Sequence, residues 1–143
     1  MTRMLIKKVR SVMIIDDDPI NNMACEIIIK SVGFTDKVIS FEQAKEALTH
    51  LKREWKNDRL LPEVILLDIN MADMDGWEFL VAFEKELNDA KEEDKFPTIF
   101  IASSSVSEDD MKRALSSALV SDFLSKPLNQ NTFRNLRNRW FTN

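Results

Sequence analysis

The chain has 143 residues, 44% of them hydrophobic and 31% charged, which is enough for one domain with its own core and argues against disorder. Its net charge of -4 argues against nucleic acid as a main partner, because phosphate binding needs a basic surface. The sequence contains no signal peptide, no run of about 20 apolar residues and only one cysteine, Cys25, so we expect a cytoplasmic protein without a membrane span or an internal disulfide.

The first part of the chain predicts a buried strand followed by a helix. Val12–Ile15 is apolar at every position, which is typical of a strand covered on both faces. Asp18 and Pro19 then predict a helix start, as the N-cap and the first helical residue, and Gly33 predicts the helix end. Residues 34–39 predict a second, weaker strand.

The rest of the chain repeats this alternation of apolar runs and amphipathic patterns. Five strand–helix units predict an α/β fold, with a five-stranded parallel sheet covered by helices on both faces. The further elements are expected at 41–55 (helix), 64–67 (strand), 79–87 (helix), 98–102 (strand), 111–118 (helix), 120–125 (strand) and 128–140 (helix).

Polar residues follow four of the predicted strands directly. These are the acidic run Asp16–Asp18, then Asp68, then the serines from Ser103, and finally Lys126. In a parallel sheet, ligands bind beyond the carboxyl ends of the strands, so these groups are expected to converge on one site. Such a combination of carboxylates, hydroxyls and an amine suits a divalent cation and a phosphoryl group.

Each group has a plausible task at such a site. Carboxylate and carbonyl oxygens are the ligands that Mg2+ prefers, and a bound cation reduces the repulsion within Asp16–Asp18. Asp68 can attack phosphorus, because aspartyl phosphates are known covalent intermediates. The Ser103 hydroxyl can donate a hydrogen bond to a phosphoryl oxygen, and Lys126 can neutralise its charge.

With these motifs the chain resembles the receiver domain of two-component response regulators, which are similar to the chemotaxis protein CheY. The resemblance rests on IIDDDP at 14–19, LLDINM at 66–71, MDG at 74–76, the serines from Ser103, and FLSKP at 123–127. It implies a flavodoxin-like, doubly wound sheet with strand order 2-1-3-4-5. Residues 1–9 are then expected to form an N-terminal tail and residues 10–143 the receiver domain.

The resemblance also implies a phosphoacceptor and a metal site. Asp68 would accept the phosphoryl group. Mg2+ would be held by Asp17 directly, by Asp16 through water, by Asp68, and by the backbone carbonyl of Asn70. The sequence departs from the family at Ala72, where proline is usual, which is expected to loosen the loop after Asp68 without removing a ligand.

The resemblance further implies a switch. Ser103 would be the switch hydroxyl, although the run of serines leaves Ser104 as an alternative. Lys126 would bind the phosphoryl group, and Phe123 falls at the aromatic position that turns inward or outward with phosphorylation.

The implied function is that of a stand-alone response regulator receiver in a two-component phosphorelay. A sensor histidine kinase or a histidine phosphotransfer protein would supply the phosphoryl group, and an unknown protein target would receive the signal. The chain would be a signalling phosphoacceptor with at most weak self-dephosphorylation, and not an enzyme. The sequence leaves open whether phosphorylation drives dimerisation.

Two other functions fit parts of the sequence. In a haloacid-dehalogenase-type phosphatase, Asp16 would be the nucleophile and Asp18 the general acid, but the chain lacks an acidic motif after Lys126 and would leave Asp68 idle. A receiver-like binding module that is never phosphorylated is the second alternative. The presence of all the site residues argues against it.

Overall fold

The computed structural model of the chain describes residues 8–104 and 107–141. None of the helices in these two stretches has the length and apolar character needed to cross a membrane. Strands and helices alternate strictly along the described chain. In order, the elements are β1 (Val12–Ile15), α1 (Pro19–Ser31), β2 (Val38–Phe41), α2 (Ala44–Asp58), β3 (Val64–Leu67), α3 (Gly76–Glu86), β4 (Thr98–Ser103), α4 (Glu108–Ser116), β5 (Val120–Ser125) and α5 (Gln130–Trp140).

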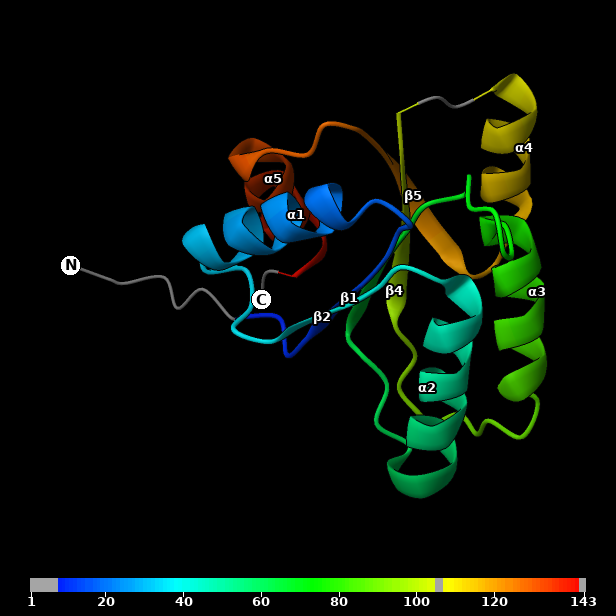
Figure 1. Cartoon of the computed structure of the whole chain (residues 1–143). Coiled ribbons are helices and arrows are strands. Elements are labelled where there is room, and N and C mark those ends of the chain that lie inside the picture. The colour runs from blue at the N-terminus through cyan, green and yellow to red at the C-terminus, as the bar shows by residue number, and fades with distance from the viewer. Residues whose placement is uncertain (1–7, 105–106, 142–143) are drawn as a thin grey trace.

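The strands form one parallel sheet in the order β2-β1-β3-β4-β5. Helices α1 and α5 lie together on one face, and α2, α3 and α4 lie on the other (Figure 1). Every residue of the inner strands β1 and β3 is buried, whereas the edge strands β2 and β5 are partly exposed. The predicted doubly wound α/β fold and its strand order are confirmed.

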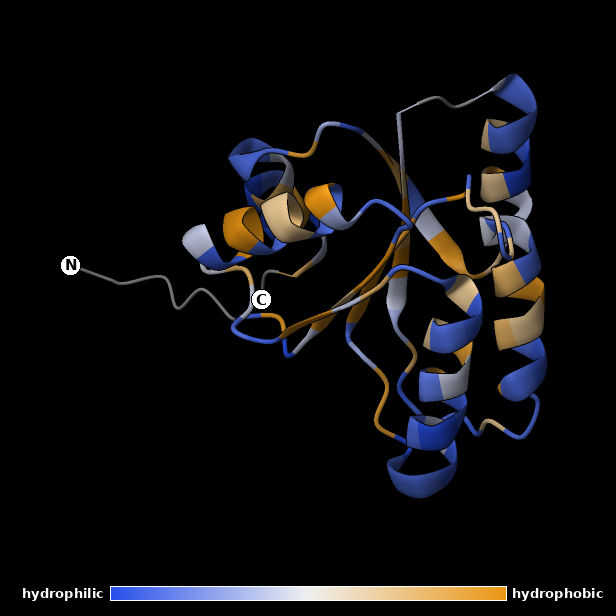
Figure 2. Cartoon of the chain, in the orientation of Figure 1, coloured by the Kyte–Doolittle hydropathy of each residue, from blue (hydrophilic) through white to orange (hydrophobic). Residues whose placement is uncertain are grey.

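The two faces of the sheet belong to two separate cores. Met13 and Ile15 point into the core beneath α2 and α3, whereas Val12 and Ile14 point into the core beneath α1 and α5. Hydrophobic colour is concentrated in the central strands, and the outer surfaces of α2, α4 and α5 are mostly hydrophilic (Figure 2). Because successive side chains of a strand face opposite ways, a sheet covered on both faces requires strands without polar positions.

Helix α1 begins and ends where the sequence predicts. The Asp18 side chain accepts hydrogen bonds from the backbone N–H groups of Ile20 (3.0 Å) and Asn21 (3.3 Å), which is the geometry of an N-cap. Gly33 follows the helix in the left-handed region at φ 66, where a residue without a side chain avoids strain. Cys25 is buried on this helix, and burial raises the pKa of its thiol to about 11.

The predicted second strand is present, but its predicted bounds, 34–39, were wrong. Strand β2 covers Val38–Phe41 instead, so Phe41, expected in the following helix, ends this strand. Phe34 is fully buried outside the sheet, with its ring centroid 5.4 Å from that of Phe133 on α5. This aromatic contact with a distant helix takes Phe34 out of the strand, and a local sequence pattern carries no sign of it.

The packed part of the chain includes residues that the sequence placed in an N-terminal tail. Val9 is buried, and its N–H donates to the carbonyl of Phe34 at 2.8 Å. Lys8 forms an ion pair with Asp36 at 2.9 Å. The rest of the expected tail, residues 1–7, lies outside the described residues.

Gly76, the first residue of α3, closes the loop that follows β3. Its N–H donates to the carbonyl of Ile69 at 3.1 Å. A Cβ atom built at this position would lie 2.8 Å from Cα of Ile69 and 3.0 Å from the carbonyl oxygen of Asp68. Both are backbone atoms, so a side chain at residue 76 requires the loop itself to move.

Replacing Gly76 with alanine is therefore expected to lower the free energy of unfolding by about 1–3 kcal/mol, as overpacking does elsewhere. Urea denaturation measures this change. Gly33→Asn is the control, because its Cβ meets no atom within 4 Å and asparagine tolerates the left-handed region, so it should cost less than about 1 kcal/mol. A Gly76→Ala variant as stable as the wild type contradicts the close backbone approach.

Candidate functional site

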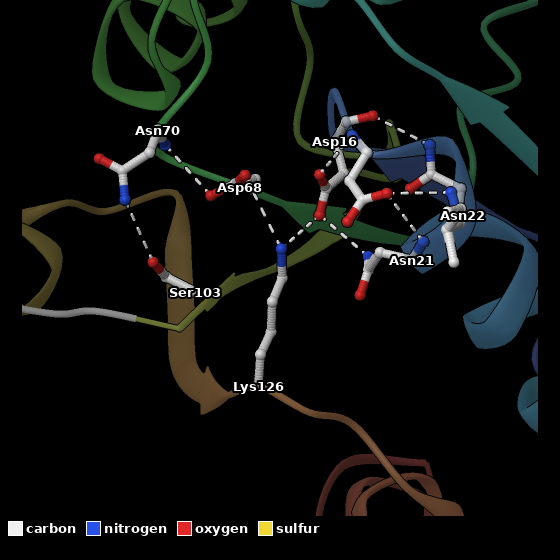
Figure 3. Close-up of polar contacts among 9 residues, drawn as sticks. Asp16, Asn21, Asn22, Asp68, Asn70, Ser103 and Lys126 are labelled. Atoms are coloured by element: carbon white, nitrogen blue, oxygen red, sulfur yellow. Dashed lines mark hydrogen bonds and ion pairs between the residues drawn. The ribbon is translucent and has the colours of Figure 1, made fainter.

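The carboxyl ends of the strands bring five predicted site residues together. Asp16 and Asp17 follow β1, Asp68 follows β3, Ser103 ends β4 and Lys126 follows β5. The side chains of Asp16, Asp68, Ser103 and Lys126 gather at one edge of the sheet, with the Lys126 amine between Asp16 and Asp68 (Figure 3). Asp17 belongs to the same acidic cluster. The predicted convergence is confirmed, and it follows from the parallel direction of all five strands.

Asp16 is buried and fixed by several donors. One of its carboxylate oxygens accepts from the backbone N–H of Asp18 at 3.0 Å. The other accepts from the Asn21 side chain at 2.9 Å and from the Lys126 amine. The Asn22 side chain donates to the Asp16 carbonyl at 2.9 Å. Asp16 is thus a rigid part of the site, held at both its carboxylate and its backbone.

Asp68 sits among charges of both signs. Its carboxylate accepts from the N–H of Asn70 at 3.1 Å, and its other oxygen lies 3.7 Å from the Lys126 amine. Burial raises the pKa of the Asp68 carboxyl above its ordinary value, and the charges of Asp16 and Asp17 act in the same direction. The Asn70 N–H and the Lys126 charge lower this pKa, but by less. Added positive charge in the site would therefore stabilise the ionised form of Asp68.

Lys126 is the cation that the chain itself supplies. Burial lowers the pKa of its amine, but the hydrogen bond to Asp16 and the charges of Asp16 and Asp68 outweigh burial and raise it. Its backbone N–H donates to the carbonyl of Ser103 at 3.0 Å, which fixes the start of the loop after β5 against β4. The ammonium group is therefore held charged beside two carboxylates.

The acidic residues suit a divalent cation. Asp16, Asp17 and Asp68 each offer a carboxylate oxygen, and these oxygens lie within 4.8 Å of one another. Ligand oxygens on opposite sides of one Mg2+ lie about 4.2 Å apart, so small side-chain rotations bring this set onto a single ion. Asp17 is exposed, which leaves the site open to solvent.

Ser103 and Phe123 lie on the side of the site formed by β4 and β5. Ser103 is buried, and its hydroxyl oxygen lies 3.4 Å from the side-chain nitrogen of Asn70, whereas the alternative Ser104 is exposed. Phe123 is half-buried and packs against a small apolar cluster that includes Ile101. The geometry favours Ser103 over Ser104 as the hydroxyl that faces the site.

Two residues that hold Asp16 were not predicted from the sequence. Asn21 and Asn22 donate to its carboxylate and its carbonyl. Asn22 is buried on α1, three residues before the buried Cys25 and seven before the buried Ile29. It is therefore a polar residue on the core-facing side of this helix. A polar residue on an otherwise apolar helix face needs a partner, and that signal was available in the sequence.

The loop after Asp68 has an anchor that the sequence did not reveal. The Asp73 carboxylate accepts from the N–H of Lys45 at 3.1 Å, in the first turn of α2. The N-cap residue of α2, Gln43, makes no such bond with its own side chain. Asp73 thus serves as the cap of a neighbouring helix, and this contact fixes the loop next to Ala72, where the family usually has proline.

Comparison with known structures places this geometry in a family. The family model described as response regulator receiver domain matches residues 12–137. A two-component response regulator from Cytophaga hutchinsonii is 31% identical, with a TM-score of 0.81 over 93% of this chain and 97% of that one. The receiver domain of the histidine kinase CKI1 from Arabidopsis thaliana, in complex with Mg2+, shares the fold at 21% identity, with a TM-score of 0.76 over 92% of this chain and 94% of that one.

Curated relatives agree. The two-component response regulator ORR1 of Oryza sativa subsp. japonica is 30% identical over 134 residues, which are 91% of this chain and 54% of the rice protein. The probable methanogenesis regulatory protein FilR2 of Methanothrix harundinacea is 27% identical over 117 residues, which are 82% of this chain and 72% of that protein. With a family match over residues 12–137, this strand order and these acidic strand ends, the chain belongs to the receiver domain family of two-component response regulators.

Proposed function

We propose that this receiver accepts a phosphoryl group on Asp68 from a phosphohistidine, in a reaction that depends on Mg2+. The donor is a sensor histidine kinase or a histidine phosphotransfer protein, the classes with which receiver domains interact. The observation that carries the proposal is the acidic cluster of Asp16, Asp17 and Asp68 with the Lys126 amine 3.7 Å from the Asp68 carboxylate. That arrangement holds one nucleophilic oxygen among groups that can neutralise an incoming phosphoryl group.

Each residue of the cluster has a separate task in this proposal. Asp17, Asp68 and the backbone carbonyl of Asn70 would hold Mg2+ directly and Asp16 would hold it through water, and the ion would supply positive charge to the phosphoryl oxygens. Asp68 attacks phosphorus while the donor histidine leaves, so one P–N bond breaks and one P–O bond forms. Lys126 then neutralises a phosphoryl oxygen as a point charge. Slow attack of water on the aspartyl phosphate reverses the signal.

Phosphorylation is proposed to shift the chain between two conformations. The Ser103 hydroxyl donates to the phosphoryl group and draws the end of β4 toward Asp68. Phe123 turns with that movement, because it packs in the same cluster as Ile101, two residues before Ser103. The face formed by α4, β5 and α5 then binds a downstream protein differently, and a second copy of the chain at this face gives a phosphorylation-dependent dimer.

The alternatives receive less support from the geometry. As a phosphatase nucleophile Asp16 has to be free to attack, yet it is 3% exposed and bonded to Asn21 and Lys126. A binding module that is never phosphorylated does not require a charged lysine between two buried carboxylates. One lysine leaves the three carboxylates of Asp16, Asp17 and Asp68 with a net negative charge, and buried charge is unfavourable unless it is paired, so the arrangement favours a cation that neutralises the site.

An apolar stripe beside the site fits a helical phosphoryl donor. Ile20, Met23 and Ile27 are 77%, 64% and 63% exposed, and their spacing of three and four places them on one face of α1. Helix α1 begins directly after the acidic run, so a partner helix packed on this stripe reaches Asp68 with its histidine. Exposed apolar side chains gathered in this way mark protein contacts.

The first test concerns the phosphoacceptor. Incubation with Mg2+ and acetyl phosphate is expected to add one phosphoryl group to the wild type and none to Asp68→Asn, because asparagine is not a nucleophile here. Intact-mass analysis measures the adduct, and lability in base identifies it as an acyl phosphate. An adduct that survives Asp68→Asn and is lost in Asp16→Asn supports the phosphatase instead, and no adduct on the wild type supports the constitutive module.

The second test concerns the metal site alone. Free Mg2+ at 100 times its Kd is expected to stabilise the folded chain by about 2.7 kcal/mol, because the ion binds the native cluster and relieves the repulsion among its carboxylates. Thermal unfolding with and without Mg2+ measures this as a shift in Tm. Asp17→Asn is expected to lose most of the shift, whereas Asp109→Asn, on the exposed start of α4, keeps it. Equal shifts in both variants argue against the site.

The third test concerns the stripe on α1. Ile27→Ser is expected to lower kcat/KM for transfer from a histidine phosphotransfer protein by roughly tenfold, since burying an isoleucine contributes about 1.5–3 kcal/mol. Transfer from acetyl phosphate should not change, because that donor needs no protein contact. Leu115→Ser is the matched control, with a leucine that is 85% exposed on α4. A loss with both donors, or with both variants, contradicts docking at α1.

A further inference from the structure

An aromatic bridge joins the first turns of α3 and α4. The indole N–H of Trp77, the second residue of α3, donates to the carboxylate of Asp110 on α4 at 3.3 Å. The guanidinium carbon of Arg113, also on α4, lies 5.0 Å from the centroid of the Trp77 ring. One side chain thus makes a hydrogen bond and a cation–π contact to the same neighbouring helix.

The bridge reaches α4 at its N-terminal capping box. Asp110 closes a capping box with Ser107, which accepts from the Asp110 N–H at 3.1 Å and donates its own N–H to the Asp110 carboxylate at 3.3 Å. Burial raises the pKa of Asp110, but hydrogen bonds from Ser107 and Trp77 and the charge of Arg113 outweigh it and lower this pKa. The carboxylate is therefore ionised, and it binds the Trp77 indole and the helix start together.

At its other side, the Trp77 ring packs on the residues that surround the phosphoacceptor. It contacts the apolar cluster of Ile69, Ile101 and Ala114. Ile69 directly follows Asp68, and Ile101 lies two residues before Ser103. The indole thus packs against a cluster that joins the loop after Asp68, the strand that carries Ser103, and α4.

Helix α4 buries little of its own side-chain surface. Ala114 is its only buried residue, whereas Leu115 is 85% exposed and Met111 is 48% exposed. A helix with one small buried side chain gains little from the hydrophobic effect, so single polar contacts decide its position. The bridge from Trp77 supplies two such side-chain contacts, both to α3.

We propose that Trp77 is a positioning residue that couples the Asp68 loop to α4, holding α4 in its resting place and transmitting movement of the loop to it. The coupling role rests on the proposed phosphorylation of Asp68. It adds a route to α4 through the start of α3, separate from the route through Ser103 and Phe123. The resting contact itself does not require phosphorylation.

The chain contains a matched control for this bridge. Trp55 on α2 donates its indole N–H to Asp89 at 2.9 Å, and the guanidinium carbon of Arg59 lies 4.2 Å from the Trp55 ring centroid. The same three residue types thus make the same two contacts, on α2 and the loop after α3. Trp55→Phe removes an equivalent set of interactions without touching α4.

The test compares Trp77→Phe with Trp55→Phe by hydrogen exchange in peptides that cover α4, before and after phosphorylation by acetyl phosphate. In the unphosphorylated chain, exchange in α4 is expected to rise about tenfold in Trp77→Phe, corresponding to about 1.4 kcal/mol, and to stay at the wild-type rate in Trp55→Phe. After phosphorylation, the change in α4 exchange seen in the wild type is expected to shrink in Trp77→Phe alone. Intact mass gives the phosphorylated fraction for each sample.

The proposal is overturned if α4 of Trp77→Phe exchanges at the wild-type rate, or if Trp77→Phe and Trp55→Phe change the exchange of α4 equally. If no chain takes up a phosphoryl group, the proposed function has failed, and the exchange rates of the unphosphorylated variants still decide whether Trp77 holds α4. Arg113→Gln, at an exposed position on α4, removes the cation–π contact and the positive charge near Asp110, keeps the Trp77 indole, and tests the bridge if Trp77→Phe unfolds. Faster exchange in α4 of that variant supports the bridge, and an unchanged rate argues against it.

Discussion

Repulsion among the carboxylates of Asp16, Asp17 and Asp68 is the constraint on which the rest of the structure depends. Three like charges within 4.8 Å of one another are unfavourable near a core, so the fold must supply compensation around them. Asp16 is compensated by Asn21 and by Lys126. Asp17 remains in water, and the pKa of Asp68 is raised chiefly by burial, with the charges of Asp16 and Asp17 adding to it, so the negative charge of Asp68 is not fully compensated.

The parallel sheet is what makes this gathering possible. All five strands run the same way, so the residues that follow them meet at one edge, while the apolar strands themselves fill two cores. The charged groups are thus carried by rigid, buried strands but lie where solvent and a partner reach them. Incomplete compensation at Asp68 leaves a place for added positive charge, which is the condition that a metal-dependent phosphoacceptor requires.

Two sets of contacts lead from this edge toward α4. One runs along β4, where Ser103 is next to Asn70 and where Ile101 packs with Phe123. The other passes from the loop after Asp68 through the ring of Trp77. Because α4 buries little of its own surface, few apolar contacts oppose a movement of this helix that starts at Asp68.

The sequence by itself determined the fold class, the strand order by resemblance, the start of α1 at Asp18, and the identities of the strand-end residues. These features are local: a cap, a continuous apolar run or a polar residue directly after a strand has the same meaning wherever it occurs. Only the tertiary structure decided that Phe34 leaves the second strand for Phe133, that Asp73 caps α2, and that Trp77 reaches α4. Each of these contacts joins residues at least 28 positions apart. The contacts therefore form only in the folded chain, and a local sequence pattern does not reveal them.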